Sequence, residues 1–256
     1  MQISNQISNH EKFEIMQEGG KIAAYVLNEA MKRVAPGVTT FDLDKFIESA
    51  ILTRDATPAF KGYRGYKYAS CINLNDGLVH GIPRASEIIK EGDLVTIDLG
   101  VKFRGYINDC AWTKEAGKSN FHRDFLKVGK NSLKKAISEV KSGNDVLDIS
   151  RVMQEVIEKG GYNAVRDLTG HGVGSRLHEG PMIPCYYDPL YLAESGKMKE
   201  GMGLAIEVMY TEGAFDLISD RDGWTIRTKD GKISALFEET VFVSPNGPIV
   251  LTKIDE

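Results

Sequence analysis

The sequence predicts an α+β fold made of two similar halves. Segments with apolar residues at helical spacing come before segments of short β-like runs, and this order occurs twice along the chain. The first helical segments cover residues 13–34 and 39–52, and β-like runs follow them over 57–113. The second pair of helices lies within 121–159, and Gly-rich, β-like segments come after it. Blocks of helices and blocks of strands in this order are typical of the α+β class.

The ends of the predicted helices carry residues with known positional preferences. The Pro-Gly pair at 36–37 ends the first helix, and Thr39 or Thr40 begins the second, with acidic residues in its first turn. The Gly-Gly pair at 160–161 closes the last helix. These signals place the helices in pairs, one pair in each half.

A short internal repeat supports the duplication. Residues 90–99, KEGDLVTIDL, align without a gap with residues 199–208, KEGMGLAIEV, and the alignment places Asp98 on Glu207. Equivalent side chains of two related halves gather around a shared axis, which is a natural place for a functional site. We therefore expect a single domain that covers residues 1–256, with halves of about 12–118 and 119–252.

Composition excludes several classes of function. A formal net charge of -4 argues against nonspecific nucleic-acid binding, which needs a basic face. Three unpatterned cysteines imply neither a disulfide framework nor a CxxC zinc module, and they favour a reducing compartment. The polar N-terminal segment does not resemble a signal peptide, and no apolar run reaches the length of a membrane span. We expect a cytoplasmic protein that does not associate with membranes.

Two aspartates interrupt a segment that otherwise reads as a buried hairpin, VTIDLGVKFRGYINDCAWT at 95–113. A turn centred between Phe103 and Arg104 pairs Asp98 directly with Asp109. Two carboxylates in such a pair have Cβ atoms roughly 5 Å apart and repel each other. A solvated face, protonation of one carboxyl group, or a cation between the two would each relieve this repulsion.

Histidines and glutamates elsewhere in the chain favour the cation. The motif VHGIP contains His80, TGHGVGSRLHEGP contains His171 and His178, and two β-rich runs contain Glu207 and the pair Glu238 and Glu239. Such an oxygen-rich set suits Mn, Fe or Co and tolerates Zn. Two cations about 3.5 to 4 Å apart would hold a bridging water, lower its pKa and polarise a scissile carbonyl. The pattern indicates hydrolysis.

The motifs VHGIP, IDLGVKFRGYIND, GHGVGSRLHE, IEV and FEET resemble, in this order, those of the methionine aminopeptidases. The resemblance extends from about residue 12 to the C-terminus. It implies the pita-bread fold, in which a central curved antiparallel sheet has helices on its outside. It also implies a dinuclear metal centre, with Asp109 and Glu238 bridging the metals. The implied ligands are Asp98, Asp109, His171, Glu207 and Glu238. The E-x-T motif of the family selects Glu238 over Glu239, which strand alternation alone does not.

The resemblance also implies roles in catalysis and substrate binding. His80 is expected to contact the substrate amine or the departing peptide nitrogen. His178 is expected to bind the carbonyl oxygen, and Glu207 to carry the proton. The implied pocket for the methionine side chain consists of Tyr63, Tyr66, Cys71 and Trp224, with Phe60 and Leu177 at its rim. Ordinary core packing is the alternative for the aromatic residues.

The function that follows is removal of the N-terminal methionine, by attack of a metal-bound hydroxide on the first peptide bond. The expected cofactors are two divalent ions per chain, Co, Mn, Fe or Zn. The expected substrates are the N-termini of nascent polypeptides and short Met-peptides with a small second residue. From the resemblance we also expect transient contact with the ribosome and a monomeric state. The alternatives are an X-prolyl aminopeptidase or dipeptidase of the same fold, and a non-catalytic binding protein.

Two positions depart from the pattern of the family. Val208 stands where proline usually follows the ligand glutamate, and Glu239 stands where histidine often follows the bridging one. Glu239 would add a negative charge near the metals if its side chain pointed inward. The segment between Glu207 and Glu238 is too short for the helical insertion of the type II enzymes, so the chain resembles type I.

Overall fold

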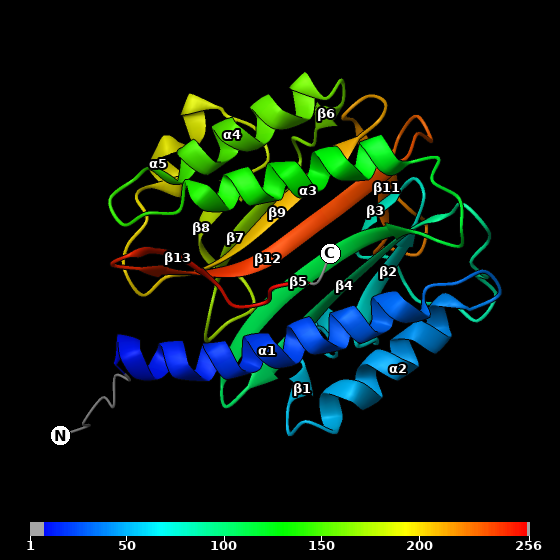
Figure 1. Ribbon diagram of the computed structural model, residues 1–256, viewed down its shortest axis with the longest axis horizontal. Helices are drawn as coiled ribbons and strands as arrows, with labels where there is room; N and C mark the ends of the chain where they lie inside the picture. The colour runs from blue at the N-terminus through cyan, green and yellow to red at the C-terminus, as the bar shows by residue number, and fades with distance from the viewer. Residues whose placement is uncertain (1–7, 255–256) are drawn as a thin grey trace.

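In the part of the chain that the structure describes, a ten-stranded antiparallel sheet forms the centre, and the helices α1 to α4 cover one of its faces (Figure 1). The computed structural model describes residues 8–254. The central path of the sheet runs β1-β4-β5-β12-β9-β7-β8, and β2, β6 and β13 pair at its sides. The central strands are β1 (Thr57–Pro58), β4 (Leu94–Phe103), β5 (Tyr106–Glu115), β7 (Thr169–Val173), β8 (Glu179–Pro184), β9 (Gly203–Thr211) and β12 (Ser234–Ser244). The side strands are β2 (Ser70–Leu74), β6 (Asn163–Ala164) and β13 (Gly247–Val250).

The four predicted helices form, with small differences at their ends. They are α1 (Asn9–Arg33), α2 (Thr40–Leu52), α3 (Arg123–Ser138) and α4 (Val146–Lys159). Thr39 caps α2 by accepting a hydrogen bond from the backbone of Asp42, as its position predicts. The predicted start of the first helix at residue 13 is wrong, because Ser8 caps α1 by accepting from the N–H of Glu11. A short helix that was not predicted, α5 (Leu192–Ser195), follows the 3-10 turn Pro189–Tyr191. Among the described residues, no helix has an apolar stretch long enough to cross a lipid bilayer.

The order of the central strands is symmetric about the contact between β5 and β12. In the path β4-β5-β12-β9, the outer strands contain parts of the segments 90–99 and 199–208, and the inner strands β5 and β12 pair with each other. α1 packs on β4 and β5, whereas α3 packs on β12 and β9. The division of one domain over 1–256 into halves of 12–118 and 119–252 stays a prediction, and residues 1–7 and 255–256 lie outside the described residues.

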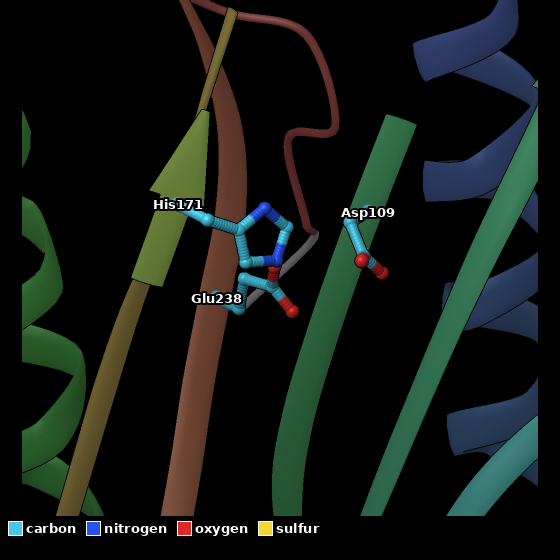
Figure 2. A group of neighbouring side chains, drawn as sticks. All are labelled: Asp109, His171 and Glu238. Carbon is cyan, nitrogen blue, oxygen red and sulfur yellow. The ribbon is translucent and has the colours of Figure 1, made fainter. Parts of the chain in front are cut away.

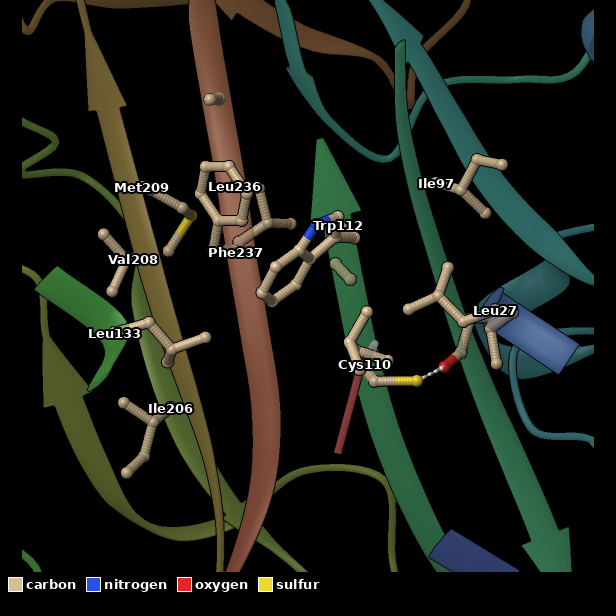
Figure 3. Close-up of a cluster of buried hydrophobic side chains, with 14 of the residues drawn as sticks. Leu27, Ile97, Cys110, Trp112, Leu133, Ile206, Val208, Met209, Leu236 and Phe237 are labelled. Carbon is tan, nitrogen blue, oxygen red and sulfur yellow. Dashed lines mark hydrogen bonds between the residues drawn. The ribbon is translucent and has the colours of Figure 1, made fainter. Parts of the chain in front are cut away.

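The hydrophobic core lies between the sheet and the helices. Ile97, Cys110, Val208 and Phe237 are fully buried and belong to one cluster, of which Figure 3 shows the centre. Gly129 lets α3 approach closely, because a Cβ atom there would lie 2.5 Å from the ring of Phe237. With this face of the sheet covered by helices, polar strand residues that alternate with the core must point to the other face.

The turn of the β4–β5 hairpin lies one residue further along the chain than the sequence interpretation placed it. Phe103 pairs with Tyr106, so Arg104 and Gly105 are the two loop residues. Their φ values of 45° and 90° are those of a two-residue turn with both central residues in the left-handed region. Arginine is not a usual first residue of this turn, so the residue types alone do not locate its centre.

The register of the two aspartates changes accordingly. Asp98 pairs with Ala111 and Asp109 pairs with Gly100, so the predicted direct pairing of the two aspartates is wrong. The shift is two residues, and a shift by an even number keeps each side chain on its face. Asp98 and Asp109 are therefore diagonal neighbours on the face that the helices do not cover.

A second, three-stranded sheet lies beside the cavity that Trp224 and His80 line. It has the order β10-β11-β3, with β10 at Leu217–Ser219, β11 at Ile226–Thr228 and β3 at Gly77–Val79. Because β11 pairs with β3, the segment between β10 and β11 is held close to the residues that follow β3. This contact brings Trp224 and His80 to one cavity.

Candidate metal centre and substrate cavity

Three acidic side chains form a row across the middle of the large sheet. Asp98 on β4 and Glu238 on β12 both pair with Ala111 of β5, and Glu238 also pairs with Glu207 of β9. Directly paired residues of antiparallel strands point to the same face. The three carboxylates therefore share one face, and the small side chain of Ala111 separates Asp98 from Glu238.

The neighbouring row supplies one more carboxylate and one imidazole. Asp109 lies on β5, where its N–H donates to Thr240 Oγ1 at 2.9 Å. On the far side of Thr240, Ala205 of β9 pairs both with Thr240 and with His171 of β7. Figure 2 shows Asp109, His171 and Glu238 projecting from three strands toward one space. All five residues that the sequence predicts as ligands thus come from two adjacent rows.

The carboxylates are buried without enough hydrogen-bond partners. Within residues 8–254, the oxygens Asp98 Oδ1, Asp109 Oδ1 and Glu238 Oε1 are buried and accept no hydrogen bond. Burial raises the pKa of Asp109 to about 8. Burial, followed by the charges of the neighbouring carboxylates, raises the pKa of Asp98, Glu207 and Glu238 well above their ordinary values. A group of acids this costly to ionise needs a compensating positive charge.

The donor set fits divalent metal ions. Asp109, His171 and Glu238 each offer one ligand atom, and these atoms all lie within 4.8 Å of one another. Buried carboxylate oxygens that accept no hydrogen bond are free to coordinate. Asp98 and Glu207 line the same cavity, and their carboxylates are further oxygen donors there. Oxygen ligands with one imidazole suit Mn, Fe, Co or Zn.

His171 has the protonation state that a metal ligand requires. Its Nδ1 lies 2.9 Å from the carbonyl oxygen of Gly172, which can only accept, so Nδ1 carries the hydrogen. Its Nε2 then has a free lone pair and lies 3.5 Å from Glu207 Oε1. Burial, and next the nearby His178, lower the pKa of His171 to about 4. The ring is therefore neutral at pH 7.

The two departures from the family pattern point away from this centre. Glu239 pairs with Ile206, one position beyond the Glu238–Glu207 pair, and therefore lies on the helix-covered face. Its Oε1 accepts a hydrogen bond from the N–H of Ile254 at 3.2 Å. Val208 is fully buried on the same face as Glu239. Neither residue adds charge to the cluster of carboxylates, and the observed register places Glu238, not Glu239, on the face of that cluster.

A local backbone clamp places His80 at the cavity. Asn73 of β2 donates from Nδ2 to the carbonyl of Val79 at 3.2 Å and accepts at Oδ1 from the N–H of Gly81 at 3.0 Å. These two bonds hold the chain on both sides of His80, whose φ of 58° is uncommon for a residue with a side chain. A Cβ atom at position 81 would lie 2.2 Å from a backbone oxygen of β2, so the close approach requires glycine.

His178 is oriented by an aromatic neighbour. The hydroxyl of Tyr63 lies 2.9 Å from His178 Nδ1. The His178 ring also lies 4.3 Å from the His171 ring, measured between centroids. Burial, and next the charge of Arg64, lower the pKa of His178. The imidazole is thus fixed beside the carboxylate cluster with its other nitrogen free.

The apolar end of the cavity is built by three residues. Tyr66 is buried, with its hydroxyl 2.9 Å from the carbonyl oxygen of Gly81, and its ring meets Trp224 edge-on at 5.0 Å between centroids. Asp222 fixes the Trp224 turn by accepting from the N–H groups of Trp224 and Thr225, each at 2.9 Å. Cys71 pairs with Asp98 and is buried between these rings and the acidic row.

One cavity of about 300 Å³ is lined by the carboxylates, the three histidines and the apolar side chains of the site. It contains every site residue that the sequence predicts, and two that were missed, Arg64 and Val79. Arg64 lies within the predicted motif between Tyr63 and Tyr66, and its position in that loop was the available signal. The predicted residues are Phe60, Tyr63, Tyr66, Cys71, His80, Asp98, Asp109, His171, Leu177, His178, Glu207, Trp224 and Glu238.

Known proteins resemble this chain over nearly its whole length. Residues 14–245 match the profile of Metallopeptidase family M24. A methionine aminopeptidase of Clostridium acetobutylicum is 39% identical over 247 residues, which are 96% of this chain and 98% of the relative. The crystal structure of a methionine aminopeptidase from Thermotoga maritima aligns with a TM-score of 0.92 at 38% identity, covering 97% of this chain and 99% of the other.

Prolidases are more distant. The prolidase of Pyrococcus furiosus aligns with a TM-score of 0.76 at 26% identity, over 96% of this chain and 65% of that chain. These likenesses agree with the predicted α+β pita-bread fold and with the predicted family. The chain belongs to metallopeptidase family M24 and, within it, to the methionine aminopeptidases.

Proposed function

We propose that this chain removes the N-terminal methionine from polypeptides and short peptides that have a small second residue. The observation that carries this proposal is the pair of acidic rows, with His171, at the end of an apolar cavity. The acidic rows provide a place for divalent metal, and the apolar end provides a place for an unbranched side chain.

We propose Asp98, Asp109, His171, Glu207 and Glu238 as ligands of two divalent ions, with Asp109 and Glu238 shared between them. When bound, the ions polarise the scissile carbonyl and lower the pKa of a water molecule. The oxygen-rich donor set is compatible with Co, Mn, Fe or Zn. Buried oxygens that accept no hydrogen bond support this assignment.

The side chains around the ions would move protons and orient the substrate. Glu207, which lines the cavity beside His171, would be placed to accept a proton from a water molecule and to pass it to the departing nitrogen. If the Tyr63 hydroxyl donates to Nδ1 of His178, Nε2 carries a hydrogen that can bond to the substrate carbonyl oxygen. His80, which lines the same cavity, would contact the substrate amine or the departing nitrogen.

The methionine side chain would occupy the apolar end of the cavity. Tyr66, Cys71 and Trp224 form its walls, with Tyr63 at the entrance and Phe60 and Leu177 at the rim. The hydroxyl of Tyr66 is bound to backbone oxygen, so the ring presents its apolar surface to the cavity. A thioether adapts well to such a wall of aromatic and sulfur groups.

Activity on Met-Ala-Ser tests the proposal. The protein is stripped with a chelator, then reloaded with Mn, Fe, Co or Zn, and release of methionine is measured beside D109N. We expect turnover with at least one metal, and loss of turnover and of one metal equivalent in the variant. Unchanged activity of D109N would refute the site, and preference for Xaa-Pro peptides would favour the X-prolyl alternative. Release of methionine from no peptide would favour a non-catalytic binding protein.

The remaining expectations concern the cellular setting. N-termini of nascent polypeptides are the proposed substrates, and the relatives named methionine aminopeptidase support an N-terminal methionine. Cytoplasmic location, a monomeric state and transient association with the ribosome stay predictions. Sedimentation and co-purification with ribosomes would test the last two.

A further inference from the structure

A second cavity opens beside the catalytic one. It has a volume of about 630 Å³ and shares Tyr63, Leu177 and His178 with the catalytic cavity. The rest of its wall comes from Thr57, Pro58, Ala59, Lys61, Lys102, Ile107 and Arg176. We call this space the basic groove. A chain that leaves the catalytic cavity past His178 enters it directly.

The cations around the groove lack acidic partners. Lys102 and Arg176 are exposed in its wall, and Arg64 is exposed at the edge of the catalytic cavity. Within residues 8–254, no carboxylate forms an ion pair with any of these three. Lys61 differs, because it is paired with Glu48.

Glu179, three residues after Arg176, bonds to neutral donors and forms no ion pair with the Arg176 guanidinium among residues 8–254. Glu179 accepts from the N–H of Arg176 and from the hydroxyl of Ser175, both at 2.9 Å. The whole chain carries a net charge of -4, so three unpaired cations around one opening are a local reversal of its charge. A negatively charged ligand would supply the ion-pair partners that these three cations lack within residues 8–254.

The geometry relates these cations to particular positions of a substrate. Lys102 lies four residues beyond Asp98 on the same face of β4, which corresponds to about 13 Å along the strand. An extended peptide advances about 3.3 Å per residue. Residues three to five of a substrate, counted from its N-terminal methionine, would therefore reach the groove when the first peptide bond lies at the acidic rows.

We propose that the basic groove binds the substrate segment that follows the scissile bond and favours acidic side chains at positions three to five. This inference rests on the proposed aminopeptidase function. Arg64 would contact the earlier of these positions, and Lys102 and Arg176 the later ones.

Three peptides that differ only in charge test the inference: Met-Ala followed by three Glu, three Gln or three Lys, each with an amidated C-terminus. We expect kcat/KM to be about threefold to tenfold higher for the Glu peptide than for the Gln peptide, since each exposed ion pair contributes a factor of roughly 1.5 to 2. The Lys peptide should be the poorest. Because exposed pairs are screened, the preference should shrink at about 1 M salt.

Substitution of the three cations should remove the preference. In the triple variant R64Q/K102Q/R176Q we expect equal kcat/KM for the Glu and Gln peptides. K134Q is the matched control, because Lys134 is exposed on α3, on the other side of the sheet. The K134Q variant should keep the full preference for the Glu peptide. Thermal unfolding of each variant is the check that it is folded.

The outcomes separate this inference from the proposed function. Cleavage of Met-Ala-Ser without any preference among the charged peptides would overturn the role of the groove and leave the aminopeptidase activity intact. A preference that persists in the triple variant would overturn it as well. Failure to cleave any Met-peptide with any metal would overturn the proposed function itself.

Discussion

Glu207 and Glu238 are direct partners across β9 and β12, and their carboxylates stand on one face of the sheet. Glu239, the next residue, lies on the opposite face and accepts a hydrogen bond from the backbone of Ile254. Two adjacent glutamates of one strand thus have different environments, although both are buried. Their separation by the sheet permits a matched pair of substitutions.

E238Q should abolish metal binding at one position, whereas E239Q should not. The amide of E238Q cannot supply the negative charge that two ions need, so we expect activity to fall at least about a hundredfold. E239Q changes a group on the helix-covered face and should retain the full metal content. Metal analysis of the two purified proteins, beside turnover of Met-Ala-Ser, makes the comparison. Equal metal loss in both would show that the face assignment is wrong.

The stability of the metal-free protein should fall as pH rises from about 6.5 to 8. Burial raises the pKa of Asp109 to about 8, against about 3.9 in an unfolded chain. The folded state therefore holds this proton more tightly, and stability is lost as pH rises through the folded pKa. Asp98, Glu207 and Glu238 have the same sign. His171, with its pKa lowered to about 4, acts in the opposite sense, but only below about pH 6.5.

Thermal unfolding in chelator at several pH values measures this dependence. Saturating Mn should reduce it, because the ion replaces the protons, so the gain in Tm from Mn should grow with pH. D109N in chelator should show a weaker pH dependence than the unsubstituted chain. A metal-free protein that becomes more stable between pH 6.5 and 8 would contradict the assignment of these acids.

Y63F should impair turnover without loss of metal. The substitution removes the hydroxyl that lies 2.9 Å from His178 Nδ1, so the His178 ring loses the contact that orients it. We expect kcat to fall roughly tenfold, within the range for a positioning hydrogen bond, and the pH profile of kcat to shift. Y68F is the control, because Tyr68 packs against Tyr66 but does not line the cavity. Loss of a metal equivalent in Y63F would indicate a structural effect instead.

D44A should destabilise the fold and weaken methionine binding together. Asp44 on α2 is buried, and its Oδ1 accepts from the N–H groups of Ala69 and Ser70 at 3.0 and 2.9 Å. Leaving these buried donors unpaired costs about 2 to 4 kcal/mol of the free energy of unfolding. Because Cys71 follows Ser70, we also expect KM for Met-peptides to rise. Denaturant unfolding and steady-state kinetics measure the two effects.

D42A provides the comparison for D44A. Asp42 lies on the same helix, but it is exposed and its side chain is bound only to the hydroxyl of Thr39 among the described contacts. We expect a change below about 1 kcal/mol in the free energy of unfolding and an unchanged KM. Similar losses in both variants would mean that helix stability, rather than the buried contact, is being measured.

The faces of the strands could be predicted from the sequence, whereas the register of the hairpin could not. Side-chain alternation assigns Asp98 and Asp109 to one face whatever the turn, because an error of two residues preserves the face. The position of the turn depends on Arg104 in a left-handed conformation. Arginine rarely adopts this conformation, so its presence does not predict the turn. The alternation of side chains therefore assigns both aspartates to the correct face. Only the observed strand pairing shows which residues lie next to them.

Long-range assembly decided the rest of the site. The approach of β11 to β3 joins residues that are distant in the chain, and no local signal indicates it. The clamp of Asn73 around His80 spans only six to eight residues, but it depends on the folded positions of both backbone groups. Arg64 was missed because its neighbours carried the motif and a charged loop residue is ordinarily solvated. The choice between Glu238 and Glu239 also needed the structure. Alternation in the sequence leaves it open, and the pairing of β12 with β9 decides it.

The spread of the proposed ligands along the chain bears on when the protein can become active during its own synthesis. Asp98 and Asp109 precede α3, whereas His171, Glu207 and Glu238 follow α4. The contact of β5 with β12 must form before both sets face one cavity. A growing chain therefore lacks the complete centre until residue 238 has left the ribosome and joined the sheet. An enzyme that acts on newly made N-termini would thus begin to work only when its own fold is almost finished.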